Sequence, residues 1–220
     1  MASTAPAGSF TIMVTTNKGE TNSATFSNTK PVCIIATATF GSEVSPAVQF
    51  LRNFRDELVL STRAGSAFMD VFNAWYYSFS PSVAKVIMDN DPIRAPLRVF
   101  LYPLLGVLGV GAFAYSLFSW SPELAVVVAG LVSSSLIGLV YLTPFTYAGM
   151  RTVLKRRRIQ FNSVAKLSVA ILALAVGVLA AGEAVGSFLL LALGGSAIVL
   201  TCLIAVPMIA ALAIVRAKPS

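Results

Sequence analysis

Four long hydrophobic stretches without charged residues fill the second half of the chain. They cover residues 99–121, 124–150, 167–182 and 184–215. A helix needs about 20 mainly apolar residues to cross the hydrocarbon core of a bilayer, and the shorter third stretch can extend backward while Lys166 reaches to the headgroups. We expect Pro144 to kink or end the second helix and Pro207 to kink or tilt the fourth. The pattern predicts an all-α membrane protein with four transmembrane helices over residues 97–220.

The first half of the chain alternates apolar and polar residues over short intervals. Residues 1–31 are rich in Ser, Thr and Asn and predict a polar, mobile tail with room for one strand. Residues 32–42 form an apolar run that is too short to span a bilayer and fits either a buried strand or a helical turn on the membrane surface. Helical spacing then predicts amphipathic helices over 45–58 and 62–79, with a further helix beginning at Ser80-Pro81. We therefore predict a cytosolic or interfacial helical module over residues 32–96.

Charge sets the expected orientation of these helices. The chain has a net charge of +7, to which residues 1–98 contribute 8 − 7 = +1 and residues 99–220 contribute 8 − 2 = +6. The excess is concentrated in one loop between the second and third stretches, with Arg151, Lys155, Arg156, Arg157, Arg158 and Lys166. Because basic loops stay in the cytosol, we expect both termini to be cytosolic and the turns with Glu123 and Glu183 to lie outside.

Composition narrows the environment and the partners. With 56% hydrophobic and only 11% charged residues, the chain lies outside the range of soluble proteins. The basic excess belongs to the hydrophobic half, where it orients helices and can contact anionic headgroups. We expect a multi-pass protein of the cell membrane that contacts the lipid bilayer and other membrane subunits, and we expect no nucleic-acid binding.

Residues that could carry chemistry are few. The chain has no His, which excludes imidazole metal ligation and His-based acid–base catalysis within it, and we predict no catalytic residue, metal or cofactor. The two cysteines, Cys33 and Cys202, fall in segments of different expected depth, so both are predicted to be free thiols. Cys33 is either an inert small hydrophobe or a modified, anchored or ligand-bound residue.

Two further groups of side chains are candidates for interaction. Trp75, Tyr76 and Tyr77 fit either an aromatic anchor at the headgroup level or a small helical core. Arg52, Arg55 and Asp56 are predicted to lie on the polar side of their helix, where they form either a solvated face or a face for a cytosolic partner.

Several of these residues belong to one recognisable pattern. Residues 33–42 read Cys-Ile-Ile-Ala-Thr-Ala-Thr-Phe-Gly-Ser, and Leu51-Arg52, Phe54-Arg55-Asp56, Gly65, Tyr76-Tyr77 and Ser80-Pro81 follow. The pattern resembles the CFI-box domain, a module frequent in archaeal proteins, over residues 33–87. Ile34 stands where that family usually has Phe, and Thr39 where it usually has Ala. The resemblance implies no activity, but it favours a defined role for Cys33 and an archaeal membrane.

These observations support three hypotheses about function. The first is a non-catalytic accessory subunit of a larger membrane complex, for which an archaeal energy-metabolism complex such as ammonia monooxygenase is one setting. The second is a sensor, redox or anchoring protein that acts through Cys33 at the membrane surface. The third is a small-solute transporter, which would need Ser133, Ser134, Ser135 and Thr143 to face a shared cavity.

Overall fold

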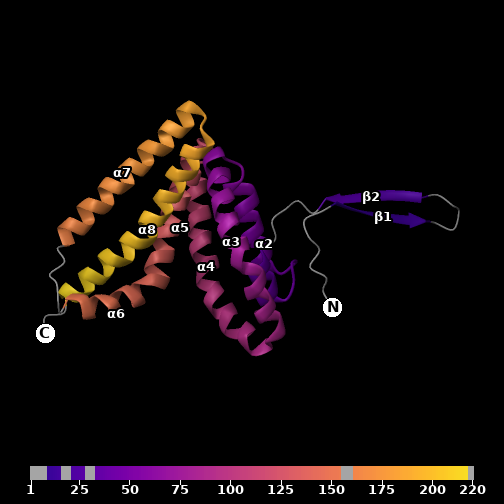
Figure 1. The fold of residues 1–220 in the computed structure, drawn as a ribbon, viewed down its shortest axis with the longest axis horizontal. Coiled ribbons are helices and arrows are strands. Elements are labelled where there is room, and N and C mark those ends of the chain that lie inside the picture. The colour runs from indigo at the N-terminus through magenta and orange to yellow at the C-terminus, as the bar shows by residue number, and fades with distance from the viewer. Residues whose placement is uncertain (1–8, 16–20, 28–32, 155–160, 218–220) are drawn as a thin grey trace. The chain divides into compact units, whose positions relative to one another are not determined.

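A computed structural model describes residues 9–15, 21–27, 33–154 and 161–217, with side chains over residues 33–150 and 162–215 (Figure 1). The chain divides into two compact units, Met1–Val32 and Cys33–Ser220. In the first unit, β1 (Ser9–Thr15) and β2 (Thr21–Ser27) form an antiparallel pair. The sequence predicts room for one strand in this tail, whereas two are present.

The second unit begins with four helical segments that correspond to the region resembling the CFI box. They are α1 (Ile34–Phe40), α2 (Pro46–Asn53), the π-helix η1 (Phe54–Val59) and α3 (Arg63–Asp89). Of the two structures predicted for residues 32–42, the helical one is therefore present. The predicted start of a separate helix at Ser80-Pro81 is wrong, because α3 continues through Pro81. Ala84 and Ile87, three and six residues beyond the proline, are buried against α1.

The long helices follow in the order that hydropathy predicts. They are α4 (Asp91–Leu117), then α5 (Pro122–Ile137), η2 (Gly138–Leu142) and α6 (Thr143–Leu154), then α7 (Phe161–Val185) and α8 (Phe188–Ala217). Four helices are long and apolar enough to cross a membrane: residues 91–117, 122–150, 162–185 and 188–215. The predicted fold class, an all-α membrane protein with four transmembrane helices, is confirmed. The predicted start of the membrane domain at residue 97 lies inside α4.

The second of these helices bends where a proline removes a hydrogen-bond donor. Pro144 cannot donate to the preceding turn, and the five residues before Thr143 form the π-helix η2. Figure 1 shows α6 leaving the direction of α5 at this point. The bend agrees with the prediction for Pro144 and places α6 against the end of α8, where Met150 is buried with Ala211 and Leu212.

One central core joins both halves of the second unit. It combines Ala64 and Ala67 of α3 with Val126 of α5, and with buried residues of α7 and α8 such as Leu179 and Leu191. The helices approach closely where glycine faces a neighbouring backbone, since a Cβ on Gly194 would lie 2.8 Å from the Leu179 nitrogen. The core therefore lies at the end of the bundle where α3, α5 and α8 begin and α7 ends.

Candidate functional site around Cys33

The best-defined polar site of the second unit surrounds α1. Cys33 is the N-cap residue of this helix, and its carbonyl accepts a hydrogen bond from the Thr37 amide at 2.8 Å. The Ile35 amide lies in the first turn and has no partner within the helix, and it donates to the Tyr76 hydroxyl of α3 at 3.1 Å. At the other end, Arg98 of α4 donates from Nε to the Thr39 carbonyl at 3.0 Å. A tyrosine and an arginine from two other helices thus hold both ends of α1.

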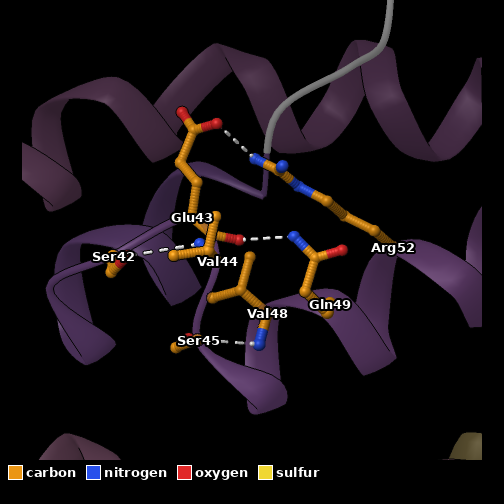
Figure 2. Close-up of polar contacts among 7 residues, drawn as sticks. All are labelled: Ser42, Glu43, Val44, Ser45, Val48, Gln49 and Arg52. Atoms are coloured by element: carbon orange, nitrogen blue, oxygen red, sulfur yellow. Dashed lines mark hydrogen bonds and ion pairs between the residues drawn. The ribbon is translucent and has the colours of Figure 1, made fainter.

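The turn between α1 and α2 is fixed by its own side chains (Figure 2). Gly41 ends α1 in the left-handed region, with φ of 80°, which favours glycine. Ser45 then caps α2 by accepting from the Val48 amide, and the Gln49 side chain donates to the Glu43 carbonyl at 2.8 Å. Ser45 is therefore the N-cap of α2, and Pro46 is its first residue.

All three residues predicted on the polar side of the helix over 45–58 take part in ion pairs. Arg52 pairs with Glu43 at 2.9 Å, and Arg55 pairs with Asp56 at 2.7 Å. Arg55 is only 8% exposed. The prediction of an exposed face is therefore wrong for Arg55, which lies in the interior with its charge compensated by Asp56.

Arg52, Arg55 and Asp56 lie close enough to Cys33 to act on its thiol. Cys33 is half-buried, and burial raises the pKa of its thiol because the thiolate loses hydration. The positive charges of Arg55 and Arg52 oppose this rise, and Asp56 adds to it. The thiol is thus protonated near neutral pH, which makes it a weak nucleophile and metal ligand. Cys33 and Cys202 are both free thiols, as predicted.

The three neighbouring aromatic residues of α3 point in different directions. Tyr76 faces α1 through its hydroxyl, and Tyr77 shares the electrostatic environment of Cys33 and Arg55. Trp75 is 62% exposed and contacts Phe72 and Phe79 on the outer side of α3. Tyr76 and Tyr77 therefore belong to the site around Cys33, and Trp75 belongs to the exposed surface.

The other predicted residues lie away from this site. Arg151 lies in α6, Lys155, Arg156, Arg157 and Arg158 lie outside the described residues, and Lys166 is exposed in α7. The serines considered for transport lie in the contact between α4 and α5 or bond their own helix. A Cβ on Gly111 would collide with the Ser133 hydroxyl, and Ser134 donates to the Gly130 carbonyl at 2.6 Å. Ser135 and Thr143 are half-buried.

Most residues of the recognised pattern have a structural task. Besides Gly41 and Tyr76, Gly65 has no room for a side chain, since a Cβ would collide with the Val59 carbonyl oxygen. Thr62 caps α3 by accepting from the Gly65 amide at 3.1 Å. Sequence reasoning missed Arg98 as a partner of α1, and its only signal was a charged residue at the edge of a hydrophobic stretch.

Comparison of the chain with family models, curated proteins and solved structures found no match. Membership of the CFI-box family therefore stays a prediction from the residues themselves. Within the described ranges, no three His, Cys, Asp or Glu side chains come together to hold a metal ion. What the geometry of the site supports is a packing role, in which Cys33, Arg55 and the two tyrosines join α1, η1 and α3.

Proposed function

We propose that the protein is a non-catalytic integral membrane subunit that packs against larger subunits of a membrane complex. The observation that carries this proposal is the surface of α7. The helix packs mainly on α8, and only 11% of its most apolar window is buried. Leu167, Val169 and Leu174 are each more than 60% exposed. Because lipid tails are as apolar as leucine, a helix in a bilayer gains stability chiefly from close packing with other helices, which partner subunits would supply to α7.

The site around Cys33 supports a structural role for the first helices. Its charged residues pair among themselves, and its tyrosine and arginine side chains hold α1 at both ends. A thiol whose pKa is raised by burial is poorly suited to nucleophilic or redox chemistry. These features favour a structural subunit, which provides contact surface to its partners, over a catalytic subunit.

The setting follows from the charge pattern and the resemblance. The basic residues between α6 and α7 favour a cytosolic location for that side of the protein and for both termini, in a cell membrane. The pattern over residues 33–87 resembles an archaeal module, and an archaeal energy-metabolism complex such as ammonia monooxygenase is one assembly that such a subunit would fit.

One observation favours a second function. Arg55 and Arg52 direct positive charge at the Cys33 thiol, which is the arrangement that would stabilise a thiolate or a negatively charged modification. Cys33 would then act as a sensor or anchoring site. Intact-mass measurement of protein from its native membrane distinguishes the two, because an unmodified Cys33 contradicts this second function.

A bulky substitution on α7 tests the proposed subunit role. Leu174→Trp places a larger apolar side chain on the surface of α7. Lipid can adapt to this side chain, whereas a closely packed partner helix cannot. We expect the tagged variant to lose most of its co-purifying subunits in mild detergent. The matched control is Phe113→Trp on the exposed side of α4, where residue 113 is 65% exposed, and it should retain them. Equal recovery of partners by both variants, or no partners with the wild type, would contradict the proposal.

A further inference from the structure

The beginning of α3 lies at the end of the bundle that the predicted orientation places outside the cell. The Glu123 carboxylate, in the turn between α4 and α5, accepts hydrogen bonds from the Arg63 amide at 2.7 Å and the Ala64 amide at 3.2 Å. A Cβ on Gly186, in the turn between α7 and α8, would lie 3.3 Å from the Arg63 guanidinium. Both turns that join candidate membrane helices at this end therefore contact the first residues of α3.

The rest of α3 follows the bundle toward the other end. Ala64 and Ala67 belong to the core formed with α5, α7 and α8, and Gly195 of α8 faces the Phe68 Cβ. After Asp89 a single residue, Asn90, leads into α4. With 27 residues each, α3 and α4 are both about 40 Å long, which matches the thickness of a bilayer including its headgroups.

The chain before α3 runs in the opposite direction, from the basic end of α4 toward its last turn. The turn after α1 lies near Arg98, at the basic end of α4, because the Arg98 side chain binds the Thr39 carbonyl. From there α2 and η1 lead to Ser61, whose hydroxyl lies 3.5 Å from that of Tyr115, near the last turn of α4. Residues 46–89 thus rise along α4 and return, so both ends of this hairpin stay on the basic side.

We infer that residues 46–89 form a helical hairpin that is embedded in the bilayer beside α4, α5 and α8, with the outer face of α3 against lipid acyl chains. The helix packs on α5 and α8, which belong to the candidate spans, and its outer face carries exposed Val71, Phe72, Trp75, Val83 and Val86. It replaces the wholly cytosolic or interfacial position that the sequence predicts for residues 32–96.

The charges inside α3 fit this depth. Counted from Arg63, Asp70 lies about 10 Å along α3, Trp75 about 18 Å and Lys85 about 33 Å. Asp70 and Lys85 are therefore within a few ångströms of the two headgroup regions, and Trp75 is near the middle. Arg55 is buried in protein with Asp56 as its partner. Hydropathy misses the hairpin because only the 14 residues between Asp70 and Lys85 are uncharged.

Tryptophan fluorescence tests the inference, because the chain has only two tryptophans. Trp120→Phe leaves Trp75 as the single reporter, and Trp75→Phe leaves Trp120, in the turn between α4 and α5, as its matched control. Each full-length variant is reconstituted alone in phosphatidylcholine vesicles with unlabelled acyl chains, with bromine near the headgroup end, or with bromine deep in the chains. Both replaced residues are exposed, and circular dichroism checks that each variant keeps its helices.

We expect Trp75 to emit at blue-shifted wavelengths, to lose most of its emission with deep bromine, and to resist aqueous acrylamide. Trp120 should be quenched more by shallow bromine and by acrylamide. Quenching of Trp75 by acrylamide but not by brominated lipid would overturn the inference, as would stronger quenching by shallow than by deep bromine. Insensitivity of Trp75 to all quenchers would also overturn it, because the face would then be covered by protein. Each of these outcomes is independent of whether the protein joins a larger complex.

Discussion

A single hydroxyl group couples α1 to α3 across 41 residues of sequence. The Tyr76 oxygen satisfies the Ile35 amide, one of the donors that every helix leaves unpaired in its first turn. Without this acceptor the amide would be left without its partner in a partly buried position, at a cost larger than the net gain of an ordinary hydrogen bond. Tyr76 therefore fixes the first turn of α1 against α3.

We predict that Tyr76→Phe destabilises the protein by about 1–2 kcal/mol, the usual cost of leaving a buried amide unsatisfied. The ring stays in place, so the change reports the hydroxyl alone. Tyr102→Phe is the control, because residue 102 is also aromatic, makes an edge-to-face contact with Phe40 of α1, and has an exposed side chain. Denaturant unfolding in detergent micelles measures the difference, and equal stability of the two variants would contradict the role of Tyr76.

We also predict that Cys33 reacts slowly with iodoacetamide and that its rate rises with pH to a midpoint above that of a free cysteine. Burial raises the pKa of the thiol, so the reactive thiolate forms only at higher pH. Cys202→Ala leaves Cys33 as the single thiol. In this background Arg52→Met should raise the midpoint further, since one of the two opposing positive charges is removed, whereas Arg94→Met should not. A midpoint below the free value would contradict this environment.

The position of Arg55 shows why the site was only partly predictable. The residue types of the site stand out in the sequence, but a helix of 3.6 residues per turn assigns Arg55 to the polar side. In the structure Arg55 is buried with Asp56 as its ion-pair partner, and its charge acts on Cys33, 22 residues earlier in the chain. Hydrophobic periodicity carries no information about which distant segments pack together, so this proximity is visible only in three dimensions.

At the level of elements, α7 and α8 form the most extensive contact between any two helices of the described chain. Glycine allows this close approach near the turn between the two helices, because a Cβ on Gly182 would lie 2.9 Å from the Leu191 nitrogen and one on Gly194 2.8 Å from the Leu179 nitrogen. A Cβ on Gly177 would meet nothing within 4 Å, so this glycine contributes no close approach.

We predict that Gly194→Ala separates α7 from α8 and destabilises the protein by about 1–3 kcal/mol, the cost of overpacking a close helix contact. Gly177→Ala is the matched control in the same helix pair, and its methyl group enters open space. Thermal unfolding in detergent should show a lower midpoint for the first variant only. A similar loss in both would indicate an effect of helix composition and not of the contact.

The spans and their order could be predicted because each helix that crosses a bilayer needs a long run of apolar residues, and such runs are visible in the sequence. Their boundaries could not, since α4 begins at Asp91, eight residues before the uncharged stretch, and α8 begins at Phe188. The first residue of a helix is decided by its capping residues and by the neighbours on which it packs, and not by where the charged residues end. The bend at Pro144 was predictable because proline removes a backbone donor wherever it stands.

At the scale of the whole molecule, the first helices and the membrane helices of the second unit are one structure. Ala64 and Ala67 of α3 share a core with α5, α7 and α8, and α1 packs between α3 and the beginning of α4. A division between a surface module and a membrane domain follows naturally from composition, because the first helices are more polar. Packing joins them, and composition carries no information about which helices share a core.

The same packing leaves α7 beside one neighbour, and this uneven burial is the basis of the proposed role as a subunit. Lipid can cover apolar side chains but cannot supply the close, shaped contacts that helices give each other. We therefore expect α7 to be the face by which the protein joins an assembly, while α3 and its tryptophan face lipid.

The most direct test is the mass of the native particle. The tagged protein is extracted from its own membrane with a polymer that keeps the surrounding lipid, and the mass of the particle and the identity of its chains are measured by native mass spectrometry. We predict other membrane proteins at a fixed stoichiometry with this chain, and their loss with Leu174→Trp. A particle that contains only this chain and lipid would contradict the central claim that the protein is a subunit of a larger complex.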